Sequence, residues 1–181
     1  MLIDLTLKIN PKNATTPLAA LGHYGTHIDV MENVSLPIEK FITVGKLIDI
    51  TLIRNRLIQV EDIEHQIPIT KNDFVIFRSC WLYDHDYGTK DYFFNHPQLS
   101  DAVIDYLLEK KISFIGLDFP GAQLHEKHKD VDLKCASQQV YLIENLNHLE
   151  LITQPSFKAY CFPMHFYGNS GIPIRVIVEI G

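Results

Sequence analysis

Short apolar segments that alternate or run together along the chain predict a protein built mostly of β-strands. Residues 2–9 (LIDLTLKI) alternate apolar and polar side chains with a period of two, which is typical of a strand. Residues 44–53 and 73–77 are nearly continuous apolar runs that predict buried strands, and residues 60–65 suggest a short helix between them. Residues 22–30 (GHYGTHIDV) start as a turn and finish as a strand candidate, and further strands are expected at residues 112–118, 140–144, 159–162 and 172–180.

The clearest helical pattern covers residues 100–111 (SDAVIDYLLEKK). Its apolar side chains recur every three or four residues, and Ser100 can cap the first turn. An apolar strand at 112–118 follows this helix directly, as in α/β proteins. The pattern therefore predicts an α/β fold over residues 1–181, a single domain with a strand-rich mixed sheet and few helices.

Composition narrows the class of protein. The 181 residues are 46% hydrophobic and 21% charged, which is typical of a globular chain. The net charge of −6 predicts neither nucleic acid nor an anionic membrane as a partner, and no apolar run reaches the roughly 18 residues that a membrane span needs. Asp4 interrupts any apolar leader, and three widely spaced cysteines do not suggest a disulfide framework. We therefore expect a cytoplasmic protein.

Two histidines and an aspartate form the motif that points to chemistry. His23, His27 and Asp29 lie within H-Y-G-T-H-I-D, and imidazole nitrogens with one carboxylate oxygen suit zinc, manganese or iron. In a fully extended segment His23 and Asp29 would lie ~20 Å apart, and in a helix Asp29 would leave the face of the histidines. The motif therefore requires a turn that brings His23 back to a strand on which His27 and Asp29 share one face.

The other histidines admit more ordinary interpretations. His125 and His128 lie in a charged stretch, HEKHKD, that is typical of a solvated loop, although His128 could enter the site if that loop folded inward. His85 and His96 flank an aromatic stretch around Trp81. That stretch could be a core or interface cluster, or an aromatic wall for a planar substrate.

The motif HYGTHIDV resembles the H-x-G-T-H-x-D-x-P-x-H signature of the cyclase family of metal-dependent hydrolases, which includes bacterial kynurenine formamidase and isatin hydrolase. Segments along nearly the whole chain follow the family's order, from LIDLT at the start through IENLNHLELI to the closing residues 163–180. The resemblance implies a cyclase-like fold and hydrolysis of a non-peptide carbon–nitrogen bond. It also implies a homo-oligomer, either a dimer or a tetramer.

Two positions depart from the family pattern. Asn33 stands where the signature ends in histidine, and Asp132 stands where the family usually carries a histidine about a dozen residues before the glutamate that is Glu144 here. In two-metal members that later histidine helps to hold the second ion. The resemblance, with these departures, therefore implies one divalent ion, zinc or manganese, held by His23, His27 and Asp29.

The resulting hypothesis is an arylformamidase-like hydrolase of a small amide, formamide or cyclic amide. Glu144 is the first candidate for orienting water or moving a proton and Asp132 the second, while Asn33 cannot titrate and can only orient or bind substrate. An alternative is a catalytically impaired relative that binds a small metabolite or partner, which the departures at 33 and 132 favour. A metal-free scaffold would require the motif to be a coincidence.

Overall fold

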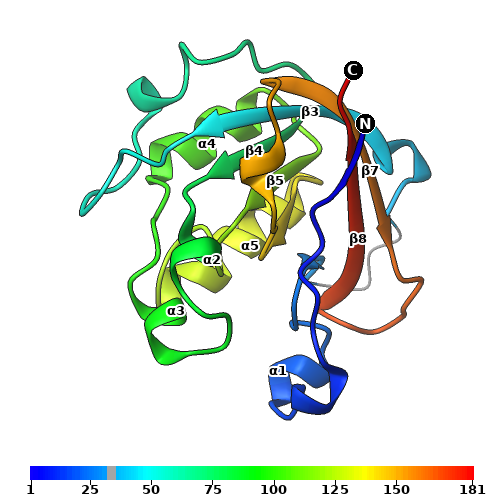
Figure 1. Cartoon of the computed structure of the whole chain (residues 1–181). Coiled ribbons are helices and arrows are strands. Elements are labelled where there is room, and N and C mark those ends of the chain that lie inside the picture. Colours follow the sequence, from blue (N-terminus) through cyan, green and yellow to red (C-terminus); the bar gives the residue numbers. More distant parts are fainter. Residues whose placement is uncertain (32–35) are drawn as a thin grey trace.

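Backbone pairing in the structure, a computed structural model that describes residues 1–31 and 36–181, joins eight strands into one mixed sheet (Figure 1). The strands are β1 Leu2–Asp4, β2 His27–Asp29, β3 Ile42–Asp49, β4 Phe74–Arg78, β5 Phe114–Leu117, β6 Tyr141–Glu144, β7 Ser156–Pro163 and β8 Gly171–Glu179. Their order is β1-β8-β2-β6-β5-β4-β3-β7, and β7 also pairs with β8. Seven strands therefore form a closed ring, with β1 paired only to β8.

The strands β3, β4, β5 and β6 are parallel neighbours, and the remaining pairings are antiparallel. Because the carboxyl ends of parallel strands meet at one edge of a sheet, the residues that end β4, β5 and β6 come together there. β2 runs antiparallel to β6, so its first residue, His27, is paired with the last residue of β6, Glu144. This pairing brings the N-terminal motif to the carboxyl edge of the parallel strands.

Alternation along the strands produces two apolar layers. In β4, Phe74 and Ile76 belong to the cluster inside the closed sheet, while Val75 and Phe77 belong to a second cluster that includes the apolar face of α4 (Asp101–Glu109). Figure 1 shows α4 and α5 (Glu126–Ser137) along one side of the sheet. The strand-rich α/β fold with a mixed sheet is thus confirmed.

The predicted helix at 100–111 is confirmed as α4, and the Ser100 hydroxyl accepts a hydrogen bond from the Val103 amide at 3.3 Å. The expected short helix at 60–65 is only a 3-10 turn. The remaining helices and turns are α1 Pro17–Ala20, α2 Trp81–Asp84, α3 Lys90–Phe94, η1 Pro11–Asn13, η2 Ile38–Lys40, η3 Val60–Asp62 and η4 Leu149–Leu151. None of the helices in the described part of the chain is long and apolar enough to cross a membrane.

Two local predictions were wrong. The strand expected over residues 2–9 ends at Asp4, because backbone groups of the next residues bond to loops and not to a strand. The Leu5 carbonyl accepts from the Asn147 amide, and the Leu7 amide donates to the Thr26 hydroxyl. The HEKHKD stretch is not a loop: residues 126–130 form the first part of helix α5, and residue 125 is its N-cap. Only three residues of α5 are buried, and one of them is Asp132, so no apolar stripe marks the helix in the sequence.

His96 shows how the outer layer holds a polar group. Its ring stacks on Phe119 with centroids 5.7 Å apart, and Nδ1 lies 2.8 Å from the Pro97 carbonyl oxygen. Burial lowers the pKa of His96 from the ordinary 6.5 to about 4, even though the hydrogen bond to Pro97 opposes that shift. The folded protein therefore holds this histidine neutral in the weakly acid range.

A folded-state pKa below the unfolded value contributes stability that is present above pH 6.5 and is lost as the pH falls through about 4. We expect His96→Gln to lose less stability than the parent protein between pH 6.5 and 4, by up to about 3 kcal/mol at roughly 1.4 kcal/mol per pKa unit. Urea unfolding at a series of pH values measures this difference. His65→Gln, at a side chain that is 85% exposed, serves as the control and should change nothing. Parallel pH dependences of His96→Gln and the parent would contradict the assignment.

Candidate metal centre

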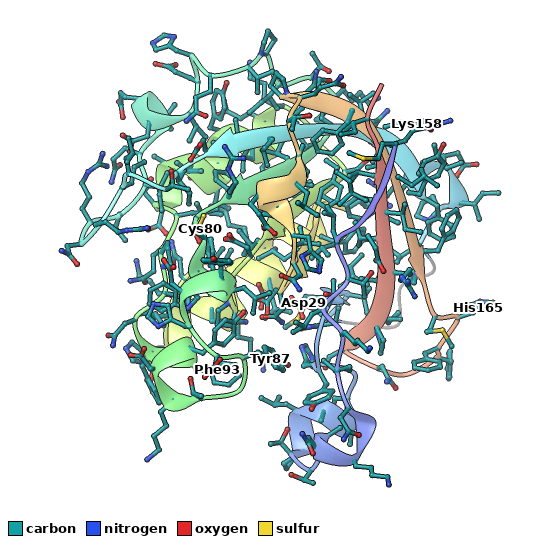
Figure 2. The ribbon with its side chains drawn as sticks, in the orientation of Figure 1. Asp29, Cys80, Tyr87, Phe93, Lys158 and His165 are labelled. Atoms are coloured by element: carbon teal, nitrogen blue, oxygen red, sulfur yellow. The ribbon has the colours of Figure 1, made fainter. Side chains whose placement is uncertain are left out.

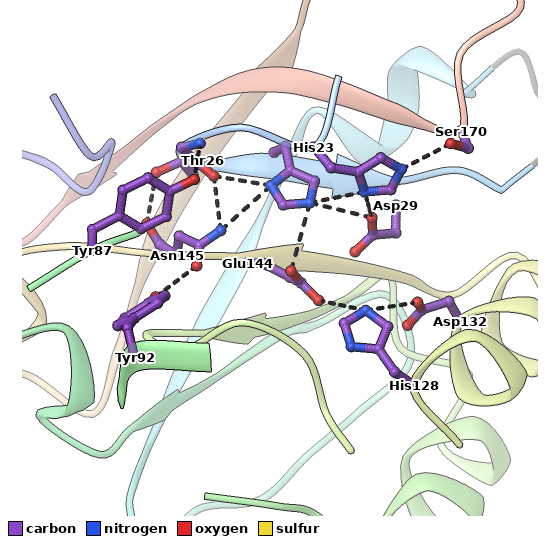
Figure 3. Close-up of polar contacts among 12 residues, drawn as sticks. His23, Thr26, Asp29, Tyr87, Tyr92, His128, Asp132, Glu144, Asn145 and Ser170 are labelled. Carbon is purple, nitrogen blue, oxygen red and sulfur yellow. Dashed lines mark hydrogen bonds and ion pairs between the residues drawn. The ribbon is translucent and has the colours of Figure 1, made fainter. Parts of the chain in front are cut away.

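The predicted turn exists and brings His23 beside the strand that carries His27 and Asp29. Gly22 and Gly25 both have positive φ angles, of 93° and 66°, which reverse the chain before β2 begins. His23 Nδ1 lies 3.2 Å from His27 Nε2 and 2.9 Å from Asp29 Oδ1, and His27 Nε2 lies 3.4 Å from the same oxygen. The three side chains predicted to share an ion are therefore brought together, and Figure 3 shows His23 beside Asp29.

A glycine and a serine at the start of β8 place the His23 ring. Its Nε2 lies 2.8 Å from the Ser170 hydroxyl oxygen, and a Cβ at position 171 would come within 2.9 Å of the ring. The ring thus occupies space that any larger residue at 171 would need. This contact directs Nδ1, the other ring nitrogen, toward His27 and Asp29.

A second group of ionisable side chains faces the first. His128 and Asp132 lie one turn apart on α5, with His128 Nε2 3.2 Å from Asp132 Oδ2 and 3.5 Å from Glu144 Oε1. Glu144 bridges the two groups, because its Oε2 lies 3.6 Å from His27 Nε2. Both predicted catalytic carboxylates therefore lie at the centre.

The prediction that His128 is solvated was wrong. It lies on α5, its side chain is only 35% exposed, and it points to Asp132 and Glu144. Gly121 makes this possible, since a Cβ there would lie 2.3 Å from His128 Nδ1. An imidazole thus enters the site one helical turn before position 132. His125 is exposed, as expected of a solvated side chain.

Three carboxylates in this centre are almost completely buried: Asp29, Asp132 and Glu144 are 1%, 3% and 3% exposed. Within the described residues, neither Asp29 oxygen, nor Asp132 Oδ1, nor Glu144 Oε1 has a hydrogen-bond partner. Imidazole nitrogens lie 2.9–3.6 Å from the oxygens of these three carboxylates. Buried carboxylate oxygens need a cation or a donor, so this arrangement of nitrogen and oxygen atoms fits a divalent ion.

The proximity of opposite charges shifts the pKa values strongly. Burial alone would raise the pKa of Asp29, but His27 and His23 hold it well below its usual range. Burial would lower the pKa of His27, yet Asp29 and Glu144 raise it to about 9. Burial and the charge of Asp29 raise the pKa of Glu144 to about 8, and that of Asp132 to about 6. Burial opposes protonation of His128, but Asp132 and Glu144 raise its pKa to about 10. The centre therefore contains several groups able to exchange protons near neutral pH.

Polar residues around the centre were missed by sequence reasoning. Tyr87 and Asn145 bond to the backbone of Gly25, Asn145 also lies 3.5 Å from His27 Nδ1, and Tyr92 bonds to Asn145. Figure 3 shows Tyr87, Tyr92 and Asn145 together at one side of the centre. The aromatic stretch supplies both tyrosines, and Phe93 packs against them. Two other rings lie elsewhere: His85 stacks on Trp81, and Tyr83 is 81% exposed. No local signal joins Asn145 to residues more than 50 positions away. Asn33 lies outside the described residues.

The Cyclase family model, described as "Putative cyclase", matches residues 3–123. No curated protein sequence matches the chain. A solved potential metal-dependent hydrolase with cyclase activity is 23% identical, with a TM-score of 0.77 over 98% of this chain and 96% of its own. A predicted metal-dependent hydrolase from Bacillus stearothermophilus is 22% identical, with a TM-score of 0.75 over 98% and 97%. Isatin hydrolase A from Labrenzia aggregata is 16% identical, with a TM-score of 0.78 over 98% and 93%. These similarities establish a shared fold.

The raised pKa of Glu144 predicts that protein dialysed free of metal loses folding stability as the pH rises. Its folded-state pKa of about 8 exceeds the ordinary 4.5, so its contribution to stability is present at acid pH and is lost as the pH rises through 8. Glu144→Gln cannot ionise and should escape that loss. We expect the metal-free variant to melt higher than the metal-free parent at pH 9 by about 3 °C or more, as roughly 1 kcal/mol gives in a domain of this size. Glu150→Gln, at an exposed carboxylate, is the control, and equal melting of all three proteins would contradict the prediction.

Proposed function

Because the chain belongs to the Cyclase family, we propose that it is a metal-dependent hydrolase that cleaves a carbon–nitrogen bond in a small amide, formamide or cyclic amide. The observation that carries the proposal is the convergence of His23, His27 and Asp29, in which both oxygens of a buried aspartate lack a donor among the described residues. His27 and Asp29 take their positions from β2 and His23 from the glycine turn. One divalent ion, zinc or manganese, belongs at this place.

When bound, such an ion supplies Lewis-acid chemistry: it makes water more acidic and polarises a carbonyl oxygen. The chain's own residues supply the proton handling. Glu144 and Asp132 lie on the opposite side of the centre from His23, with His128 between them. Glu144 lies beside two imidazoles at the centre, where it can take a proton from water and deliver it to a departing nitrogen.

Glu144 is the first candidate for this proton transfer and Asp132 the second. Glu144 lies within reach of both imidazoles, His27 and His128, whereas Asp132 contacts His128 alone. The partly exposed His128 can relay a proton between the two carboxylates and solvent. We assign Asn33 to substrate binding or orientation, because its amide cannot titrate.

An alternative is a family relative that binds a small metabolite or a partner without turning it over. The replacement of two family histidines by Asn33 and Asp132 favours it. The imidazole that His128 brings to the centre favours the enzyme instead. Incubation of the purified chain with a panel of amides, formamides and lactams, with added zinc or manganese, separates the two: binding without product formation supports the alternative.

The same proposal covers the domain organisation, location, assembly and small-molecule partner of the enzyme. We infer one domain over residues 1–181, a cytoplasmic location, assembly into a dimer or tetramer, and a small-molecule amide as the partner. Sedimentation of the purified chain tests the assembly. The substrate panel includes an arylformamidase substrate, although no single residue described above makes the site specific for it.

Metal content tests the ligand assignment directly. We expect one ion per chain at the group formed by His23, His27 and Asp29. Removing a residue that hydrogen-bonds to a ligand typically lowers metal affinity roughly 10–100-fold, and His27→Ala, which removes a ligand itself, should lower it by more. Elemental analysis and chelator competition measure the change. His165→Ala is the matched control, since His165 is exposed and lies far from Asp29 (Figure 2). Metal content unchanged in His27→Ala would refute the assignment.

Turnover tests the role of Glu144. With whichever amide proves to be a substrate, Glu144→Gln should lower kcat by ~10²-fold or more, the usual scale of acid–base catalysis, because it keeps the shape and removes the proton carrier. The variant should remain folded by circular dichroism. Near-parental turnover together with a lower melting temperature would show instead that the carboxylate is structural, and proton transfer would then pass to Asp132 or His128.

A further inference from the structure

The backbone of Gly25 contacts the predicted ligand His27 on one side and Tyr87 on the other. Its carbonyl oxygen is 2.9 Å from His27 Nδ1, and its amide donates to the Tyr87 hydroxyl oxygen at 2.7 Å. The residue has a φ of 66°, and a Cβ there would lie 2.9 Å from the side chain of Ile9. The carbonyl belongs to the Gly25–Thr26 peptide group, and that peptide group is bonded to His27 directly.

Asn145 and Tyr92 hold the carbonyl side of that peptide group. The Asn145 side-chain amide donates to the Gly25 carbonyl at 2.9 Å, and its nitrogen lies 3.5 Å from His27 Nδ1. The Tyr92 hydroxyl donates to Asn145 Oδ1 at 2.6 Å. Tyr92 is completely buried, and burial together with the charge of Glu144 raises the pKa of its hydroxyl well above 10, so the hydroxyl remains a donor.

These contacts decide which ring nitrogen of His27 carries the proton. A carbonyl oxygen can only accept, so Nδ1 must be the donor in the neutral imidazole. The lone pair then belongs to Nε2, the nitrogen that faces His23 Nδ1 at 3.2 Å and Asp29 Oδ1 at 3.4 Å. If the Asn145 amide turned over, its oxygen would face the Gly25 carbonyl oxygen, and the bond from Tyr92 opposes that turn.

We propose that Tyr92, acting through Asn145 and the Gly25 carbonyl, is a positioning residue that holds His27 with its Nε2 lone pair directed at the metal site. The inference rests on the proposed function in one respect, that His27 is a metal ligand. Tyr92 touches neither the ligand atoms nor Asp29; its effect passes along the contacts Tyr92–Asn145–Gly25–His27. Helix α3, which carries Tyr92, is thereby linked to the metal site 65 positions earlier in the chain.

The test compares zinc affinity by chelator competition in the full-length chain and its variants. Tyr92→Phe removes only the hydroxyl and should weaken zinc binding about tenfold, within the range found for partners of ligating histidines. Tyr160→Phe is the matched control, because the Tyr160 hydroxyl donates to Glu179 Oε2 at 2.7 Å, at the end of β8 that lies away from His23 and His27. It should change affinity by less than about twofold. In an Asn145→Ala background, Tyr92→Phe should cause no further loss.

Two outcomes overturn the inference while leaving the proposed function standing. The first is parental affinity in Tyr92→Phe when His27→Ala loses the metal, and the second is an equal loss from Tyr92→Phe with and without Asn145. Parental affinity in His27→Ala would instead refute the ligand assignment itself. A purely structural role for the hydroxyl would lower the melting temperature with and without zinc but leave the affinity unchanged.

A second measurement needs no variant. In the zinc-loaded parent labelled with 15N-histidine, long-range nitrogen–proton spectra should show the His27 proton on Nδ1, protected from exchange with solvent. Zinc bound through Nδ1 of His27, with the proton on Nε2, would overturn the inference even if Tyr92→Phe failed to fold.

Discussion

Burying three carboxylates within one small centre is the constraint around which the rest of this structure is arranged. Asp29, Asp132 and Glu144 are nearly inaccessible to solvent, and an ionised carboxylate that leaves water without a partner costs several kcal/mol. Three imidazoles approach these oxygens, yet hydrogen bonds within the described chain leave several of them unmet. The centre is thus compatible with folding only because cations or protons neutralise it, and its stability and its chemistry depend on the same charges.

Strand pairing, the helical repeat and two glycines together bring the imidazoles to the buried carboxylates. The antiparallel pairing of β2 with β6 places His27 opposite Glu144, and the helical repeat of α5 places His128 beside Asp132. The two outlying histidine rings then need space, which is provided by the missing side chains of Gly171 and Gly121. Backbone geometry therefore decides which residues meet, and glycine decides whether a ring can enter.

Features set by neighbours in sequence were predictable. The apolar segments identified the main strands, and helix α4 was predicted from its apolar stripe and its serine cap. His23, His27 and Asp29 lie within seven positions, so their meeting required only a turn. Glu144 was expected only through the family resemblance, as the glutamate of the IENLNHLELI segment.

Features set by distant contacts were not predictable in the same way. Helix α5 turns a carboxylate, Asp132, toward the core, which removes the apolar periodicity that would have revealed it and made His128 look solvated. The contacts of Asn145 with Tyr92 and Gly25 span 53 and 120 positions, and no spacing rule anticipates them. The early end of β1 has the same origin, because loops far along the chain capture its backbone.

The closed sheet also imposes an order of assembly on the site. The first strand, β1, pairs only with the last, β8, and β8 also flanks β2 and directly follows Ser170, the serine beside His23. During synthesis the N-terminal histidines emerge long before α5, β6 and β8 exist to receive them. The N-terminal motif therefore meets the rest of the centre only once α5, β6 and β8 have been synthesised and the sheet can close around it.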